Sequence, residues 1–518
     1  MNLRFCLLIV SFTLIAIVRS QTTLTIDPSK SYQVIEGFGA SDCWTVNYVG
    51  KFWKQEEKEK AAKWLFSSSF DKNGNPKGIG LSIWRFNIGG GTVEQGDSSH
   101  ISDLTRRAEC FINSEGQYNW TKQAGQQWFL EKAKSYGCKS FVAFSNTPPV
   151  FLTRNGYGHG LKDGNANLKT EKYAAYASFL VDVANYFDKK KNIKFDYISP
   201  VNEPQWNWDG TYQEGSPWQN YEIKKIVVEL DRKLIEKKCN SSILISEAGT
   251  WEKLSKPAGR ASNQIFNFFD AKGESEMLKI NNLNRIIAGH SYWTDTDNKR
   301  LKQIRDSVWL KAKQYNVKVH QTEWSLLSVP PIDDFPKSYE EATYTDIALQ
   351  MAKIIYADLA YANASTWSFW TSMDVEMNGF KNRFNLIRLQ TKNNQTKTIE
   401  GGGKVLAMKN LWVLGNYSLF VRPGYKRINI SGADNLSGLM GISFISPNGK
   451  KIVTVLTNNS TKPIDVELEL PKSIKSNIFN IKSYLTDKNS NLKYTDITKT
   501  KSLNLPFKSV STIIYELK

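Results

Sequence analysis

Between residues 33 and 404, short apolar runs alternate with longer amphipathic stretches. The apolar runs predict strands that begin near Gln33, Gly80, Ser140, Asp196, Ile243, Arg285, Val317 and Ala364. The amphipathic stretches predict helices over residues 123–136, 171–187, 219–238, 301–315 and 340–361. Several strands are apolar at consecutive positions, which is typical of strands buried on both faces. Eight strand–helix units therefore predict a parallel (β/α)8 TIM barrel over residues 37–404.

A different pattern begins near residue 405. Short β-rich runs cover residues 439–445, 451–457, 464–470, 478–485 and 511–517, and turn sequences such as 446–449 separate them. All 16 tryptophans lie at or before Trp412. We expect residues 405–518 to form a small antiparallel β-sandwich. The alternating run 22–26 predicts that residues 21–36 add an N-terminal strand to it.

The first twenty residues have the pattern of a secretory signal peptide. Arg4 precedes an apolar run over residues 5–18, and small residues end it at Ser20. This run of 14 residues is shorter than the roughly 17–25 needed to span a bilayer. We expect cleavage near Ser20 and an extracellular or periplasmic protein without stable membrane insertion. An uncleaved anchor or an N-terminal helix is the alternative.

Composition excludes some classes of protein. A chain with 41% hydrophobic and 12% aromatic residues can bury a large core. The net charge of +18 raises the question of a nucleic-acid partner, but the lysines are interleaved with acidic residues, as over residues 55–60. We therefore expect solvated helix faces and no nucleic acid. The four cysteines after the signal allow three disulfide pairings, and buried free thiols are equally compatible with the sequence.

Candidate chemistry gathers where the predicted strands end. Glu203 follows the fourth barrel strand and Glu323 follows the seventh, 120 residues later. These strands face one another obliquely across the mouth of an eight-stranded barrel, so both carboxylates can flank one bond. Glycoside hydrolysis needs such a pair, one protonating the departing oxygen and the other attacking the anomeric carbon. A lone glutamate at a strand end is more often a helix cap or an ion-pair partner, but the pair favours catalysis.

Other strand-end residues fit supporting roles. Arg85 and Tyr292 could keep Glu323 ionised and oriented, and Asn202 could hold a sugar hydroxyl. We expect Glu247 to contact the residues around the catalytic pair rather than the substrate itself. Tryptophans outside the strands are better candidates for stacking on sugar rings than those within strands, which are expected in the core. The tryptophans outside the strands are Trp44, Trp206 and Trp208.

No cofactor is expected. The glycine-rich segments 37–39, 89–91 and 401–404 lack the spacing of nucleotide-binding loops. The four histidines show no metal-binding spacing, so the sequence predicts no metal site.

Together these motifs resemble glycoside hydrolase family 30. The resemblance rests on residues 37–44 (GFGASDCW), 84–90 (WRFNIGG), 145–149 (SNTPP), 201–206 (VNEPQW) and 321–324 (QTEW). Within the family, residues 202–206 followed by 213–216 (QEGS) look most like the endo-β-1,6-galactanase branch. The resemblance implies a barrel fused to a β-sandwich and a retaining mechanism, with Glu203 as acid/base and Glu323 as nucleophile.

The resemblance also implies roles for the residues around the pair. Arg85, Asn202, Tyr292 and Trp370 fall at positions that support the nucleophile or bind the sugar on its glycone side, and Asp42 and Asn146 at positions that bind sugar hydroxyls. We expect a secreted enzyme that cleaves β-1,6-galactosidic linkages, as in arabinogalactan side chains. A β-1,6-glucanase, a β-glucosidase or glucosylceramidase, a xylanase, and a non-catalytic glycan-binding protein are the alternatives. Endo or exo action and oligomeric state stay open.

Overall fold

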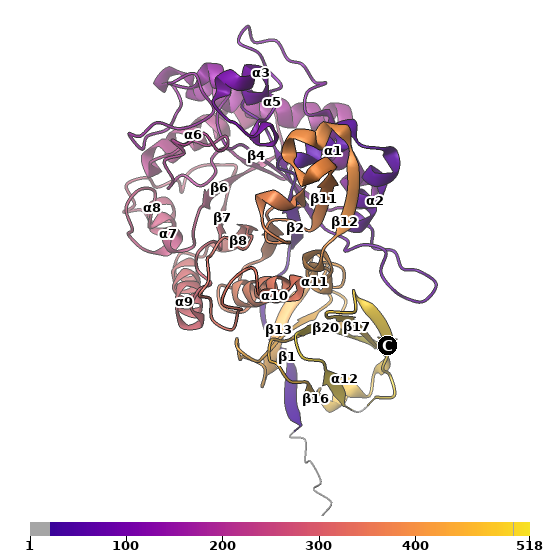
Figure 1. Cartoon of the computed structure of the whole chain (residues 1–518). Helices are drawn as coiled ribbons and strands as arrows, with labels where there is room; N and C mark the ends of the chain where they lie inside the picture. The colour runs from indigo at the N-terminus through magenta and orange to yellow at the C-terminus, as the bar shows by residue number, and fades with distance from the viewer. Residues whose placement is uncertain (1–20, 501) are drawn as a thin grey trace, which may run out of the picture.

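A computed structural model describes residues 21–500 and 502–518. The predicted signal peptide, residues 1–20, lies outside the described residues. The chain folds into a closed barrel wrapped by helices, with a mostly antiparallel sheet packed beside it (Figure 1). Of the described helices, none is both long and apolar enough to cross a membrane.

Eight parallel strands close the barrel, as the sequence predicts. Each strand pairs with the next along the chain, and the last returns to the first where Gly37 lies opposite Thr366. The strands are β2 (Gly37–Ser41), β3 (Ile83–Asn87), β4 (Ser140–Phe144), β5 (Tyr197–Ser199), β6 (Ser242–Ala248), β7 (Leu283–His290), β8 (Lys318–Glu323) and β9 (Thr366–Phe369). All residues of β2, β3 and β9 are buried, which explains their continuous apolar pattern.

The five predicted helices are present as α4, α5, α6, α9 and α10. The α-helices among the described residues are α1 (Thr45–Phe52), α2 (Gln55–Phe66), α3 (Thr92–Gln95), α4 (Ala124–Ser135), α5 (Tyr173–Lys191), α6 (Asn220–Glu236), α7 (Glu252–Ser255), α8 (Gln264–Phe269), α9 (Asn298–Gln314), α10 (Tyr344–Ala360), α11 (Lys409–Ser418) and α12 (Lys472–Lys475). The predicted start of α10 at residue 340 is too early, because Thr343 and Asp346 form a capping box that begins the helix at Tyr344.

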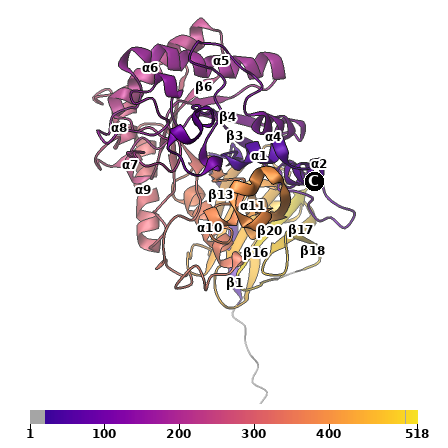
Figure 2. The same ribbon diagram turned by 45° about the horizontal axis from the view of Figure 1, so that its top comes forward.

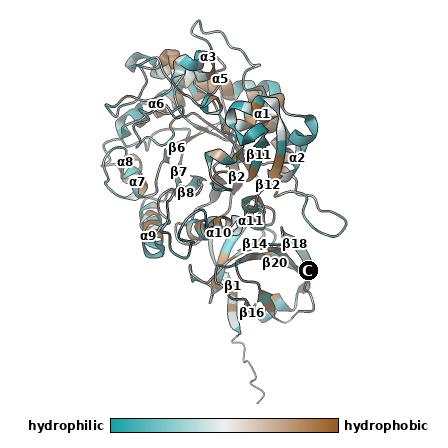
Figure 3. Cartoon of the chain, in the orientation of Figure 1, coloured by the Kyte–Doolittle hydropathy of each residue, from teal (hydrophilic) through white to brown (hydrophobic). Residues whose placement is uncertain are grey.

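The wrapping helices are amphipathic. In α9 the buried residues Leu301, Ile304, Val308 and Ala312 recur at helical spacing and form one apolar stripe toward the barrel. Figure 3 shows the corresponding mixture of hydrophilic and hydrophobic colours along the helices around the barrel.

A small sheet follows the last barrel strand. It consists of β10 (Met373–Val375), β11 (Ile387–Thr391) and β12 (Gly403–Ala407) and lies near α1 in Figure 1. The domain boundary expected near residue 405 falls within β12, so the chain leaves this sheet just before α11. Helix α11 then packs against α10 and the barrel strand β2 on one side and against β17 and β20 of the second sheet on the other.

The second sheet contains both ends of the described chain. Its order is β18-β17-β20-β15-β14-β13-β1-β16-β19. The strands are β1 (Thr22–Val34), β13 (Lys426–Ser431), β14 (Leu439–Ile445), β15 (Lys451–Asn458), β16 (Ile464–Glu469), β17 (Ile478–Thr486), β18 (Lys493–Asp496), β19 (Leu503–Leu505) and β20 (Ser509–Leu517). Strand β1 pairs antiparallel with β13 and parallel with β16, so the N-terminal segment joins the two halves of the sandwich.

One apolar core fills the sandwich. Leu24 and Ile26 from β1 pack with Ile428, Val466 and Ile513 from four strands in total. The sequence places Gln33 and Val34 in the first barrel strand, but both belong to the end of β1, and β2 begins only at Gly37.

The four cysteines among the described residues, Cys43, Cys110, Cys138 and Cys239, are buried free thiols. This agrees with the thiol alternative.

Candidate active site

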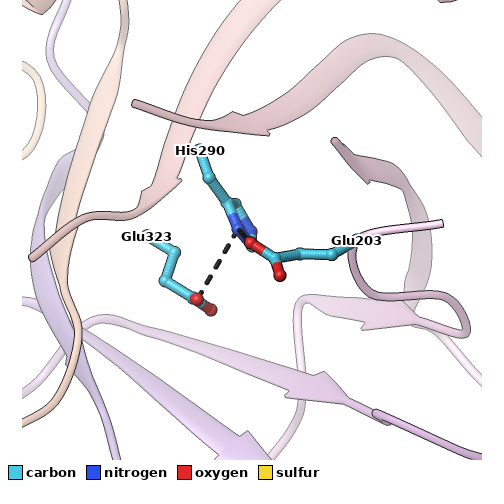
Figure 4. A group of neighbouring side chains, drawn as sticks. All are labelled: Glu203, His290 and Glu323. Atoms are coloured by element: carbon cyan, nitrogen blue, oxygen red, sulfur yellow. Dashed lines mark hydrogen bonds and ion pairs between the residues drawn. The ribbon is translucent and has the colours of Figure 1, made fainter. Parts of the chain in front are cut away.

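Two glutamates meet at the carboxyl end of the barrel. Glu323 is the last residue of β8, the seventh barrel strand, and Glu203 lies four residues beyond β5, the fourth. Figure 4 shows the two side chains pointing toward one another on either side of His290, the last residue of β7. Ligand atoms of the three residues, one carboxylate oxygen from each glutamate and a ring nitrogen of His290, all lie within 4.8 Å of one another. Two carboxylates this close can act on the same glycosidic bond.

Glu323 is held by two donors. The guanidinium of Arg85 lies with Nη1 2.9 Å from Oε2 of Glu323 and is itself fully buried. The hydroxyl of Tyr292 donates to Oε1 over 2.9 Å. Burial and the nearby carboxylates raise the pKa of Tyr292 well above its ordinary value, so this hydroxyl keeps its proton. Both donors hold the carboxyl group of Glu323 in one orientation.

Glu203 has a different environment. Its Oε1 lies 2.8 Å from Nδ1 of His290. Burial raises the pKa of Glu203; His290 lowers it, and the charge of Glu323 raises it further, for a net increase. The site therefore holds the pKa of Glu203 above its ordinary value, as a proton donor requires. A raised pKa suits a carboxyl group that must donate a proton, whereas the two donors around Glu323 suit a carboxyl group that acts as a nucleophile.

His290 is the residue whose importance the sequence did not indicate. Its Nε2 lies 3.2 Å from Oε2 of Glu247, while Nδ1 faces Glu203. Burial alone would lower the pKa of His290, but the surrounding carboxylates raise it to about 10. His290 is therefore an imidazolium at neutral pH. The only signal in the sequence was its place at a strand end, two residues before Tyr292.

Glu247 balances these charges. Burial opposes its ionisation, yet Arg85 at 3.4 Å, His290 and the hydroxyl of Thr322 lower the pKa of Glu247 to about 2. It is a permanent anion that holds both cations in place. Glu247 thus touches the two residues that contact Glu323 and Glu203, without being part of the cleft wall.

The group Glu203, His290 and Glu323 has a spacing that could surround a metal ion. His290 lies with Nδ1 against Glu203 and Nε2 against Glu247, so it joins the group into one hydrogen-bonded network.

A cleft of about 470 Å³ opens above the two glutamates. Seven of the ten residues expected in the site line it: Trp44, Asn202, Glu203, Trp206, Tyr292, Glu323 and Trp370. On one side Trp44 and Trp370 form an edge-to-face pair with ring centroids 5.2 Å apart. On the other, Trp206 and Trp293 form a similar pair at 5.2 Å. Flat aromatic walls of this kind suit sugar rings.

The other three expected residues, Asp42, Arg85 and Asn146, are not part of the cleft wall. Asn146 accepts a hydrogen bond from the Asn202 side chain over 3.0 Å, so it positions a wall residue. Asp42 is fully buried and accepts from the backbone N–H of Asn87 over 2.8 Å, and burial raises its pKa to about 7. Direct contact of Asp42 or Asn146 with a sugar stays a prediction.

Residues away from the strand ends complete the wall of the cleft, and the sequence did not predict them. The segments between barrel strands and helices contribute four of these residues, Trp293, Arg106, Tyr212 and Gln213. Trp208, considered for stacking, also lines it, and its Nε1 donates to the backbone oxygen of Glu203 over 3.0 Å.

The backbone at the strand exits is unusual. Glu203 has a φ of 45° and Glu247 a φ of 51°, in the left-handed region that side-chain-bearing residues seldom adopt. The N–H of Glu203 donates to the oxygen of Glu247 over 2.8 Å and ties the two loops together. Such conformations cost on the order of 1 kcal/mol each and concentrate at functional sites.

Comparison with known proteins agrees with this geometry. Residues 21–380 match the family model described as O-Glycosyl hydrolase family 30. An endo-β-1,6-galactanase of Hypocrea rufa is 28% identical over 253 residues, which cover 45% of this chain and 51% of the relative. An exo-β-1,6-galactobiohydrolase of Bifidobacterium longum is 23% identical over 238 residues, covering 36% of this chain and 16% of the relative. The chain thus spans about half of the first relative and less of the second.

Solved structures share the fold over nearly the whole chain. A conserved exported protein from Bacteroides fragilis is 33% identical with a TM-score of 0.87, and the match covers 95% of this chain and 100% of that one. The catalytic domain of a xylanase from Talaromyces cellulolyticus, 20% identical, matches with a TM-score of 0.67 over 95% and 99% of the two chains. By the extent of the family match, this chain belongs to O-glycosyl hydrolase family 30.

Proposed function

We propose that the protein is a secreted, retaining glycoside hydrolase that cleaves β-1,6-galactosidic linkages, with Glu203 as acid/base and Glu323 as nucleophile. The separation of the two carboxylates carries the proposal. Oxygen atoms of Glu203 and Glu323 lie within 4.8 Å. Retaining enzymes keep the two groups about 5–5.5 Å apart, whereas inverting enzymes leave roughly 6.5–9.5 Å for a water molecule.

In the first step an ionised Glu323 oxygen attacks the anomeric carbon and the bond to the leaving oxygen breaks. That oxygen takes the proton of Glu203 and departs as an alcohol. A galactosyl ester remains on Glu323, and Glu203 is now a carboxylate. Arg85 and Tyr292 hold the attacking carboxylate in line throughout.

The second step depends on the negative charge that Glu323 loses when the ester forms, because that charge affects the pKa of Glu203. While Glu323 is an anion it raises the pKa of Glu203; as an ester it no longer does. The pKa of Glu203 then falls under the influence of His290, so its carboxylate persists and takes a proton from water. The water oxygen attacks the anomeric carbon, the ester bond breaks, and Glu323 leaves as a carboxylate. Configuration is retained after two inversions.

Two relatives support the choice of linkage, because their names, endo-β-1,6-galactanase and exo-β-1,6-galactobiohydrolase, both specify a β-1,6-galactosidic linkage. The endo branch is favoured because the endo-acting relative matches a larger share of this chain. Secretion is supported by the signal-like pattern of residues 1–20 and by the exported neighbour from Bacteroides fragilis.

Separate replacement of the glutamates tests the assignment. Glu323→Gln should lose nearly all turnover on β-1,6-galactan. Glu203→Ala should retain hydrolysis of aryl galactosides with good leaving groups and regain rate with azide, which needs no base. Glu236→Gln, at an exposed position on α6, is the matched control and should keep the parental rate. Parental rates in both active-site variants would refute the proposal.

A panel of polysaccharides tests the linkage. β-1,6-Galactan should release reducing ends faster than β-1,6-glucan, glucuronoxylan or aryl β-glucosides. A preference for any of these three would move the protein to another activity of the family. Binding of galactan without release of reducing ends would identify a glycan-binding protein instead.

A further inference from the structure

A second hollow lies between the barrel and the sandwich and shares no lining residue with the catalytic cleft. Its volume is about 380 Å³. It is surrounded by strands β15, β17, β18 and β20, by the segment that follows α11, and by the loop that follows α2. That loop is closed by a bridge between Phe70 and Pro76, and it reaches the sandwich where Asn75 accepts from the backbone N–H of Tyr494 over 3.0 Å. Figure 2 shows the loop beside β17 and β18.

Aromatic rings form one wall of the hollow. Tyr484 lies at the centre, with ring centroids 4.4 Å from Phe420, 5.5 Å from Tyr494 and 6.1 Å from Phe70. Phe70 is 40% exposed although it is a large apolar side chain. Gly74 rests on the ring of Tyr494, where a β-carbon would approach to 2.7 Å, so the loop is fitted to the wall. Tyr484 and Phe420 are themselves buried, so the aromatic surface left accessible here is that of Phe70 and, in part, Tyr494, which sugar rings can use.

Cations exceed acids in this hollow. Arg422, Lys451 and Lys482 line it together with a single carboxylate, Glu516. The two lysines share this carboxylate, at 3.8 Å and 3.0 Å. Among the described residues no carboxylate lies within ion-pair distance of Arg422, whose Nη1 donates to the backbone oxygens of Gly80 and Ser418. The lining therefore carries two positive charges in excess and is complementary to an anion.

We propose that this hollow is a second glycan-binding site that takes an acidic sugar ring, such as a uronic acid residue of a polysaccharide. Phe70 and the accessible part of Tyr494, both backed by Tyr484, would pack against the C–H face of the ring, and Lys451 and Lys482 would face its carboxylate. Such a site would hold an acidic polysaccharide on the enzyme without taking part in bond cleavage. The proposal does not depend on which linkage the active site cleaves.

Affinity electrophoresis tests the proposal with the full chain. Native gels contain either gum arabic, an arabinogalactan that carries glucuronic acid, or the same polymer with its carboxyl groups reduced. The matched variants are K451Q/K482Q inside the hollow and K462Q/K475Q, which removes the same charge from exposed positions on the sandwich. A third variant, Phe70→Ala, removes an exposed ring, and its melting temperature is checked against the parent.

Gum arabic should retard the parent and K462Q/K475Q equally. K451Q/K482Q and Phe70→Ala should bind at least about fivefold more weakly while hydrolysing a small aryl galactoside at the parental rate. Carboxyl reduction should weaken binding of the parent to a similar extent. The proposal is overturned if the parent is not retarded, if both lysine pairs weaken binding equally, or if carboxyl reduction has no effect. Glu323→Gln bears only on the catalytic assignment, so the two proposals fail separately.

Discussion

Replacing His290 with glutamine tests whether an imidazolium controls the acid/base residue. The imidazolium lies 2.8 Å from Oε1 of Glu203 and lowers the pKa of that carboxyl against the effect of burial. Glutamine keeps a hydrogen-bonding group there but carries no charge. The pKa of Glu203 should therefore rise in His290→Gln. Because cleavage needs the protonated form, the alkaline limb of the pH–rate profile should move to higher pH.

Coulomb's law sets the size of the shift. Two unit charges at the separation of these atoms interact by about 6 kcal/mol at an effective dielectric constant of 20, and by about 1.5 kcal/mol in bulk water. At about 1.36 kcal/mol per pH unit, these limits correspond to roughly one to four units. The hydrogen bond that glutamine supplies offsets part of the gain. A shift of at least about one unit is the expected result.

The assay is kcat/KM for β-1,6-galacto-oligosaccharides between pH 4 and 9, a substrate whose poor leaving group requires the acid. An aryl galactoside with a good leaving group serves as the internal control, since its cleavage depends little on protonation. His100→Gln, an exposed histidine on a loop, is the matched variant and should leave the profile unchanged. A folded His290→Gln whose alkaline limb stays in place or moves to lower pH would refute this reasoning.

Three further outcomes follow from the site. Tyr292→Phe removes a hydrogen bond to a charged group, typically about 1.5–3 kcal/mol, so kcat/KM should fall by roughly 10- to 150-fold with little change in melting temperature; an unchanged rate would contradict the role of this hydroxyl. The folded-state pKa of His290, about 10, lies above the ordinary 6.5, so its contribution to stability is complete below about pH 6.5 and is lost as pH rises through 10. Chemical denaturation at several pH values between about 6.5 and 10 should show that the free energy of unfolding falls more steeply with pH for the parent than for His290→Gln. Equal pH dependence in the two proteins would count against a charged His290. Trp293→Ala should raise KM for galactan and leave that for a small aryl galactoside unchanged, because Trp293 is 41% exposed and packs edge-to-face with Trp206; equal effects on both substrates would place it outside substrate binding.

Much of the fold could be predicted because buried strands are apolar at successive positions and are flanked by turn residues. Strand β14 has the predicted bounds, since apolar residues fill it and turn residues flank it. The approach of Glu203 to Glu323 followed from barrel topology alone, because the fourth and seventh strands end at the same mouth.

Other features depend on contacts that no local pattern records. Strand β13 reads KRINIS, too polar for an apolar run, and is defined by its neighbours β1 and β14. The charge of His290 results from carboxylates on three different strands or their loops, which a single strand end cannot indicate. Trp293 and Arg106 reach the cleft from loops, whose paths hydrophobic periodicity does not describe.

The first anomer released from β-1,6-galactan tests the double displacement most directly. Proton NMR during the opening minutes of hydrolysis, before mutarotation, separates the anomeric signals of the new reducing end. We expect the β-anomer first and the α-anomer only as the product equilibrates. Initial release of the α-anomer would mean a single inversion, and Glu323 could not then be the nucleophile.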